Sequence, residues 1–259
     1  MLKRRTDLAV EATQLWQEQA GETTQLRGVQ ARDSVREGYK VTTVRILDES
    51  GAQALGKPVG TYITVELDGL LRREEDAFPR AARALAAELR GLLDLKEGDA
   101  VLVAGLGNRA ITPDGIGPKA ADYTLVTRHL VEQVPEQFGA FRPVSALAAG
   151  VLGTTGMESG ELISAVVEKT RPACVLAVDA LASRSLRRVG RTVQLSDTGI
   201  VPGSGVGNHR MALNRETLGV PVIAIGVPTV VDAATLACDL LSEAGREDLD
   251  PAALSGAGE

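Results

Sequence analysis

The second half of the chain alternates short apolar runs with stretches of helical periodicity. The runs that fit strands are residues 100–104, 173–178 and 220–225, with a shorter one at 192–195. The stretches that fit helices lie near 119–134, 159–170 and 230–243. Apolar strands that alternate with helices are typical of a parallel sheet whose faces are covered by crossover helices. The pattern therefore predicts an α/β fold whose main sheet begins after Gly98.

Two earlier segments alternate between apolar and polar residues, which is typical of strands with one buried face. They are residues 41–47 and 61–67, and the turn formers Gly51, Gly56, Pro58 and Gly60 lie between them. We predict an antiparallel pair of strands here. A helix is predicted to open at Pro79, because an apolar face recurs at helical spacing through Ala82, Leu85, Leu89 and Leu92.

Both ends of the chain carry weaker patterns. The first forty residues are polar and mixed, with one weakly amphipathic stretch over residues 8–20, and we predict that they form a peripheral arm. The tail over residues 245–259 is rich in Ala, Gly, Ser and acidic residues, and we predict that it is flexible.

Composition narrows the class of protein. Of 259 residues, 44% are apolar, which is enough to bury a core in one domain or at most two. The 28 Lys and Arg against 34 Asp and Glu leave a formal charge of −6, so direct nucleic-acid binding is disfavoured. No apolar run approaches the roughly 20 residues that span a bilayer, and no signal-peptide pattern follows the start. We expect a cytoplasmic protein without a membrane partner, and its two cysteines, Cys174 and Cys238, as buried free thiols.

Two carboxylates follow strands of the predicted sheet. Asp114 lies in the loop after strand 100–104, and Asp179 directly follows strand 173–178. Open parallel sheets bind ligands at the carboxyl ends of their strands, and neighbouring carboxylates push their pKa values apart, so that one holds a proton while the other activates water. The pair is a candidate acid and base; the alternative is that each aspartate caps a helix or closes a turn.

Glycine-rich segments and a short aspartate motif point to other chemistries. Residues 105–110 match a relaxed dinucleotide fingerprint, but Pro113 and Pro118 indicate an extended loop where that fingerprint needs a helix. Residues 203–208 lack the Gly-Lys-Ser/Thr ending of a phosphate-binding loop, so we expect no nucleotide cofactor. Asp197-Thr198-Gly199 spells the tripeptide of pepsin-like proteases, although an aspartate that forms a turn explains it equally in an α/β pattern.

Two further functions stay open. Asp114, Asp179, Asp197 and His209 are a possible ligand set for a metal-dependent hydrolase, although the sequence has no H-E-x-x-H motif and we expect no metal. A non-catalytic, oligomeric protein that binds acidic peptides is the second, because a set of arginines is available to pair with them or simply to coat the surface. These are Arg142, Arg184, Arg187, Arg188 and Arg210.

Several segments, in order along the chain, closely resemble the germination (spore) protease family of endospore-forming bacteria. They are residues 106–108 with 112–114, 142–146, 179–182, 196–200, 202–208 and 218–233, with a further short match at 5–11. The resemblance runs roughly over residues 99–239, a little over half the chain.

This resemblance implies an endopeptidase that degrades small acid-soluble spore proteins during germination. The family cuts after an acidic residue that is followed by a large apolar residue and Ala, and Asp7-Leu8-Ala9 has this form. By similarity the chain is a sporulation zymogen of the spore core that assembles as a homotetramer. It cuts itself between Asp7 and Leu8, so that residues 1–7 form a propeptide and residues 8–244 one protease domain. The family is similar in fold to hydrogenase-maturation proteases, which implies a three-layer α/β sandwich with a mostly parallel sheet, beside the small antiparallel element.

The family's catalytic aspartates map onto Asp114 and Asp179, the pair that follows the strands, without a cofactor. We assign binding of the substrate or shaping of the site to a further set of residues. They are Asp197, Gly203, Ser204, Gly205, Asn208 and Arg184.

Overall fold

The computed structural model describes residues 6–20, 26–203 and 210–231, together with residues 233, 236, 237 and 240. The tail over residues 245–259 and most of the helix expected at 230–243 lie outside the described residues.

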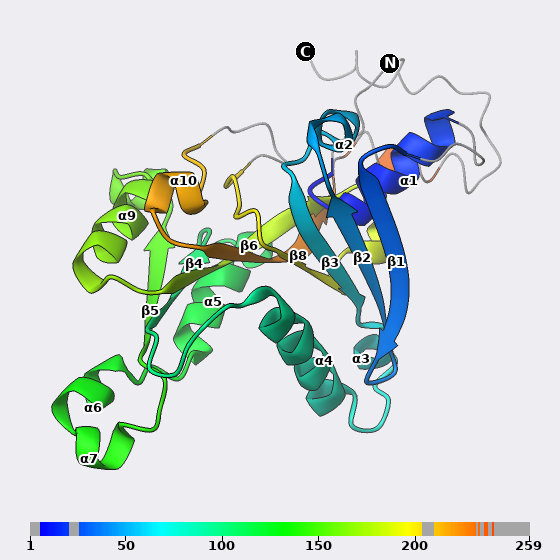
Figure 1. The fold of residues 1–259 in the computed structure, drawn as a ribbon. Coiled ribbons are helices and arrows are strands. Elements are labelled where there is room, and N and C mark those ends of the chain that lie inside the picture. The colour runs from blue at the N-terminus through cyan, green and yellow to red at the C-terminus, as the bar shows by residue number, and fades with distance from the viewer. Residues whose placement is uncertain are drawn as a thin grey trace.

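One sheet of eight strands runs through the described chain, in the order β1-β2-β3-β7-β8-β6-β4-β5 (Figure 1). In chain order the strands are β1 Val29–Arg36, β2 Tyr39–Ile46, β3 Gly60–Glu66, β4 Val101–Leu106, β5 Val144–Gly150, β6 Cys174–Ser183, β7 Thr192–Ser196 and β8 Val222–Val231. The predicted strands of the main sheet and the antiparallel pair β2–β3 are confirmed.

The sheet is mixed, which corrects the expectation of a mostly parallel sheet beside a separate antiparallel element. Strands β5, β4, β6 and β8 run parallel, whereas β1, β2, β3, β7 and β8 are paired antiparallel. The link is β7, which pairs with β3 on one side and β8 on the other and is buried along its whole length. Both halves therefore share one continuous sheet.

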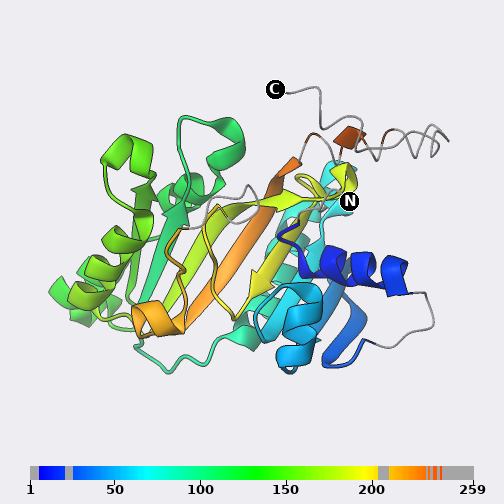
Figure 2. The ribbon, with the colours of Figure 1, turned by 90° about the horizontal axis from the view of Figure 1, so that it is seen from above.

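Helices cover both faces of this sheet (Figures 1 and 2). Helix α4 (Ala77–Leu92) packs on one face of β2, β3 and β7, while α1 (Ala9–Ala20) and α2 (Glu49–Leu55) pack on the opposite face of β2 and β3. Val41 faces α4, and Val44 and Ile46 face α1, because successive side chains of a strand point to opposite faces. Ala81 and Ala84 of α4 are buried, whereas Ala82, expected on that face, is exposed.

In the parallel half, α9 (Ser159–Thr170) and α10 (Arg215–Leu218) pack on β4, β5 and β6. The helix expected at 119–134 is two helices, α5 (Ile116–Tyr123) and α6 (Arg128–Gln133). The break is fixed at Thr127, whose N–H donates to the Val144 carbonyl (3.0 Å) and whose hydroxyl accepts from the Val144 N–H (3.0 Å). The remaining short elements are α3 Asp68–Leu71, η1 Thr112–Asp114, α7 Pro135–Phe138, α8 Leu152–Thr155 and η2 Leu186–Arg188.

The N-terminal segment is part of the core, which corrects the prediction of a peripheral arm. Leu8 and Ala9 are 0% exposed, and Leu8 and Val10 pack against Leu181 of β6 and Ile200. Residues 9–13 at the start of α1 are buried, whereas residues 14–17 are exposed or half-buried, so the amphipathic pattern along the sequence is weak. No helix among the described residues is long and apolar enough to cross a membrane.

Candidate active site

Asp114 and Asp179 line one cavity of about 330 Å³ at the carboxyl ends of β4 and β6. Asp179 is a residue of β6, in register with Gly226 of β8, and Asp114 ends the 3-10 turn η1 in the loop after β4.

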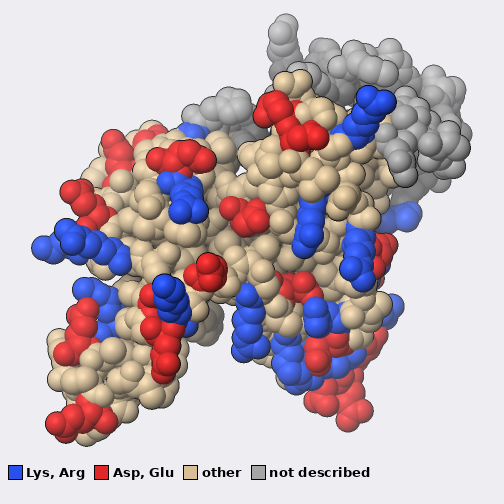
Figure 3. All heavy atoms as spheres, in the orientation of Figure 1, with Lys and Arg blue, Asp and Glu red and all other residues tan. Residues whose placement is uncertain are grey.

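Charges of both signs are interspersed over the surface in view, without a continuous basic patch (Figure 3).

Glycines allow the loop that carries Asp114 to approach the sheet closely. Gly107 has a φ of +104°, and a Cβ there would lie 2.2 Å from the Asp114 carbonyl oxygen. A Cβ on Gly117, at the start of α5, would lie 2.2 Å from the Leu106 carbonyl oxygen. The carboxylate of Asp114 accepts a hydrogen bond from the Asn108 N–H (2.6 Å). The glycines of this segment therefore position Asp114, and the helix begins only at Ile116, too late for a dinucleotide fingerprint.

Asp179 is 6% exposed, and burial raises its pKa to about 7. The negative charges of Asp114 and Asp7 raise this pKa further, whereas the Ala180 N–H, which donates to the Asp179 carboxylate (2.8 Å), and the positive charge of Arg210 lower it. A carboxyl group with this pKa holds a proton in much of the population near neutral pH. It is suited to proton transfer under those conditions.

Asp7 also lines this cavity. Its N–H donates to the Ala182 carbonyl (2.9 Å), and its carboxylate accepts from the Ala182 N–H (2.8 Å). Its carbonyl oxygen accepts from Lys57 Nζ (2.9 Å) and from Gln194 Nε2 (3.1 Å). The Asp7–Leu8 peptide bond is thus held between the end of β6 and the side chains of Lys57 and Gln194.

A second cavity, of about 290 Å³, lies next to the first. Lys57 and Gln194 line it, and Asp7, Leu181 and Ile200 line both cavities. The chain at Asp7 therefore separates the carboxylate cavity from the cavity that holds Lys57.

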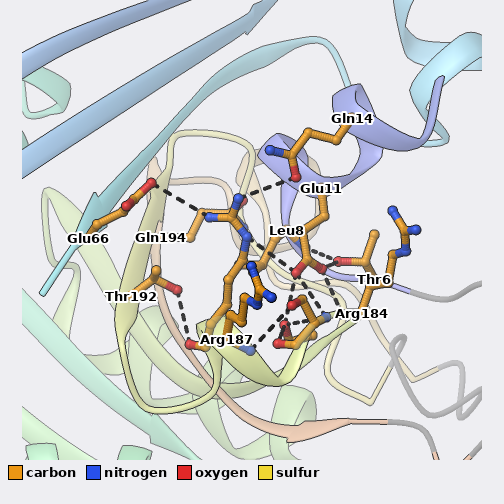
Figure 4. Close-up of polar contacts among 12 residues, drawn as sticks. Thr6, Leu8, Glu11, Gln14, Glu66, Arg184, Arg187, Thr192 and Gln194 are labelled. Atoms are coloured by element: carbon orange, nitrogen blue, oxygen red, sulfur yellow. Dashed lines mark hydrogen bonds and ion pairs between the residues drawn. The ribbon is translucent and has the colours of Figure 1, made fainter. Parts of the chain in front are cut away.

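Glu11 fixes helix α1 to the turn that follows β6 (Figure 4). Its side chain is 2% exposed and accepts hydrogen bonds from the Ser183 hydroxyl (3.0 Å), the Arg184 N–H (2.7 Å) and the Ser185 N–H (3.2 Å). The Thr6 hydroxyl also donates to it, and Arg188 Nε lies 3.4 Å from its carboxylate. This network holds the segment just after the Asp7–Leu8 bond against β6.

The other predicted residues fall in different places. Gly203 lines the cavity with the two aspartates. Asp197 is exposed and does not line it; its carboxylate accepts from the Thr61 N–H (2.7 Å) at the start of β3. Arg184 donates its backbone N–H to Glu11, and its side chain does not line the cavity. The residues of the glycine-rich loop, Ser204, Gly205 and Asn208, lie outside the described residues.

The described part of the chain does not bring together the residues for metal-dependent catalysis, nor does it place a reactive cysteine. There, no three His, Cys, Asp or Glu side chains come together as a possible metal site, and His209 lies outside the described residues. Cys174 is a buried free thiol whose pKa is raised to about 11 by burial, so it is a poor nucleophile; Cys238 lies outside the described residues.

Three residues at this site were missed from the sequence: Lys57, Gln194 and Glu11. Lys57 follows the glycine that ends α2, Gln194 lies inside a strand, and Glu11 lies in a weakly amphipathic helix. The one available signal was the form of Asp7-Leu8-Ala9, which marks the segment that all three hold.

Comparison with known proteins identifies the family. The family model described as germination protease matches residues 9–247. The chain belongs to the germination protease family. Germination protease from Caldanaerobacter subterraneus is 51% identical over 244 residues, which cover 94% of this chain and 74% of that protein. Germination proteases of Clostridium perfringens (49% identical, 93% and 74% covered) and Bacillus cytotoxicus (47% identical, 94% and 68% covered) are also similar. The chain is therefore a protease of spore germination.

Proposed function

We propose that this germination protease is an aspartate-dependent endopeptidase in which Asp114 and Asp179 activate water and protonate the leaving amine. The observation that carries the proposal is that both carboxylates line one cavity together with Asp7, whose peptide bond to Leu8 has the acidic–apolar–Ala form that the family cuts.

The raised pKa of Asp179 supports a division of roles. A carboxyl group that keeps its proton near neutral pH is suited to donate it to the leaving nitrogen, so Asp179 acts as the general acid. Asp114, whose negative charge contributes to that raised pKa, then acts as the general base that takes a proton from the attacking water.

The packing of residues 7–9 supports the proposed cleavage preference. The carboxylate of Asp7 accepts the Ala182 N–H, Leu8 is enclosed by Leu181 and Ile200, and Ala9 is completely buried. A side chain larger than Ala has no space at the position of Ala9. A polar side chain at the position of Leu8 loses the apolar contacts with Leu181 and Ile200. The chain itself thus occupies the site as a substrate of this form would.

We propose that this chain also shares the self-processing and the substrates of its family. The chain is made as a zymogen with residues 1–7 as propeptide and 8–244 as protease domain, cuts itself after Asp7, and in the spore core degrades small acid-soluble proteins. Helices on both faces of the sheet support a three-layer sandwich like that of hydrogenase-maturation proteases. The exposed apolar side chains of Tyr123 and Leu125 (90% and 74%) support assembly into a homotetramer.

The test is cleavage of a peptide that copies residues 3–12, followed by mass spectrometry. The assay uses a chain that begins at Leu8, because Asp7 of the full chain occupies the site. We expect this chain to cut the peptide between Asp and Leu, and the same chain with Asp114→Asn or Asp179→Asn to do so at least about 10²-fold more slowly, because general acid–base groups contribute that much or more. The exposed Asp94→Asn is the matched control and keeps the wild-type rate. Undiminished cleavage by both variants contradicts the proposal. Loss of cleavage with a chelator and its recovery on adding a divalent ion indicates a metal-dependent hydrolase instead.

A further inference from the structure

Two polar side chains outside the carboxylate pair hold the backbone around the Asp7–Leu8 bond. Lys57 Nζ and Gln194 Nε2 donate to the Asp7 carbonyl oxygen (2.9 and 3.1 Å), and Gln194 Oε1 accepts from the Ala9 N–H (2.8 Å). A single amide side chain thus bonds the backbone on both sides of Leu8. Contacts of this kind depend on the path of the backbone and not on the side chains of the bound segment.

The fold fixes the backbone of both residues in place. Gln194 lies in β7 between Thr64 of β3 and Gly226 of β8 and is 7% exposed. Lys57 follows Gly56, whose φ of +63° ends α2, and its N–H donates to the Ala52 carbonyl (3.1 Å). Such pre-positioned donors stabilise a developing charge without reorganising during the reaction.

The surroundings of Lys57 make its interaction strong. Burial lowers the pKa of its ammonium group below the ordinary value, and the negative charges of Asp7 and Glu11 oppose this shift only in part. In surroundings shielded from water, a positive charge next to a carbonyl oxygen stabilises negative charge on that oxygen far more than it would in solvent.

Resting on the proposed function, we propose that Lys57 and Gln194 bind the carbonyl oxygen of the acidic residue at the cleaved bond, and that Gln194 also binds the backbone of the residue two positions later. Water attacks the Asp7 carbonyl carbon, one of its protons passes to the base carboxylate, and the π electron pair of the carbonyl moves onto the oxygen that Lys57 and Gln194 hold. When the tetrahedral species collapses, the bond from the Asp7 carbon to the Leu8 nitrogen breaks, and the nitrogen takes the proton of the acid carboxyl.

Cleavage also frees this site. Once residues 1–7 leave, Lys57 Nζ and Gln194 Nε2 lose the oxygen that they bind, and buried donors without an acceptor are costly. The carbonyl of an incoming polypeptide supplies that acceptor, provided that Leu8 and Ala9 also leave the positions that its next two residues require.

The first test measures self-cleavage of the full chain by intact mass. We expect Lys57→Met to lower the first-order rate constant by about 10²-fold, the usual effect of removing one oxyanion donor. Gln194→Glu keeps an acceptor for the Ala9 N–H but replaces the donor to the carbonyl, and we expect a similar loss. The exposed Lys169→Met and Gln53→Leu are matched controls that keep the wild-type rate. Wild-type cleavage by folded Lys57→Met and Gln194→Glu, with circular dichroism unchanged, overturns this inference.

The second test changes the substrate and so does not depend on how well Lys57→Met folds. A peptide that copies residues 3–12 with N-methylalanine in place of the alanine corresponding to Ala9 lacks the N–H that Gln194 accepts. We expect its KM to rise about tenfold with the wild-type chain and to change much less with Gln194→Leu. Equal effects on both proteins overturn the inference. Once intact mass shows that the wild type has lost residues 1–7, its failure to cut any peptide refutes the proposed function itself, as does normal cutting by Asp179→Asn.

Discussion

At the scale of single residues, Asp179 is a carboxyl group almost fully shielded from water. Asp179 lies inside a strand and is almost fully buried, and the negative charge of Asp114 lies nearby. Burial, together with this charge, raises its pKa to about 7. A buried carboxylate of this kind destabilises the fold when it is ionised, and such groups gather at functional sites.

This carboxyl gives stability a pH dependence of known sign. Its pKa in the folded state is above its ordinary value of 3.8, so the folded state binds the proton more tightly, and its contribution to stability falls as pH rises from about 4 to about 7. Asp179→Asn is neutral at every pH. We expect the variant to be more stable than the wild type at pH 8, by up to about 4 kcal/mol, with a gap that narrows as pH falls to 5.

Urea unfolding at pH 5, 6.5 and 8 measures this difference, with Asp94→Asn as an exposed control that shows none of the trend. A stability difference between wild type and Asp179→Asn that stays constant over this range contradicts the raised pKa.

At the scale of elements, the first turn of α1 joins the molecule at the edge where the candidate site lies. The contacts come from the Glu11 network with the turn after β6 and from the apolar packing of Leu8 and Val10 (Figure 4). Because the Asp7–Leu8 bond directly precedes the first turn of α1, the Glu11 network determines where the bond lies relative to β6. The anchoring of α1 and the proposed cleavage are therefore coupled.

Glu11→Ala tests the anchoring. The change removes the carboxylate that accepts from the partly buried Arg184 N–H, and it leaves the Ser183 hydroxyl and the Ser185 N–H with one acceptor each, so we expect a loss of about 1–3 kcal/mol in the free energy of unfolding. We also expect slower self-cleavage, since the bond is no longer held in place. Urea unfolding and intact mass measure the two effects, and the exposed Glu168→Ala of α9 is the control. A Glu11→Ala chain with wild-type stability shows that α1 is held by its apolar contacts alone.

At the scale of the whole molecule, the sequence predicts the elements that have a local pattern of apolar residues, and it does not predict features that depend on pairing between distant segments. The buried strands β4, β6 and β8 and the helices α4 and α9 have apolar patterns and were predicted, although β6 and β8 continue to Ser183 and Val231, beyond the predicted ends at 178 and 225. Strand β1 is an exposed edge strand, and β5 contains many small residues, so neither has such a pattern and both were missed. The place of β7 between β3 and β8 depends on pairing between distant segments, which no local pattern reports.

The same distinction holds for the site. Asp114 follows β4 as predicted, whereas Asp179, predicted to follow its strand, lies inside β6, which continues to Ser183. The pair was still predictable as neighbours, because β4 ends beside Asp179 at one edge of the sheet. Lys57 and Gln194 reach the Asp7 carbonyl oxygen only because the N-terminal segment packs against distant parts of the chain. The two contacts join residues that are 50 and 187 positions apart in sequence. A lysine after a helix-ending glycine and a glutamine within a strand are otherwise ordinary.

The most direct measurement of the central claim is the intact mass of the purified chain before and after incubation at mildly acidic pH, with Asp179→Asn alongside. We expect the wild type to lose residues 1–7 and to begin at Leu8, while Asp179→Asn stays full length. Loss of the same residues from both proteins at the same rate would show that the bond is cut without the carboxyl of Asp179, and would contradict the assignment of the active site.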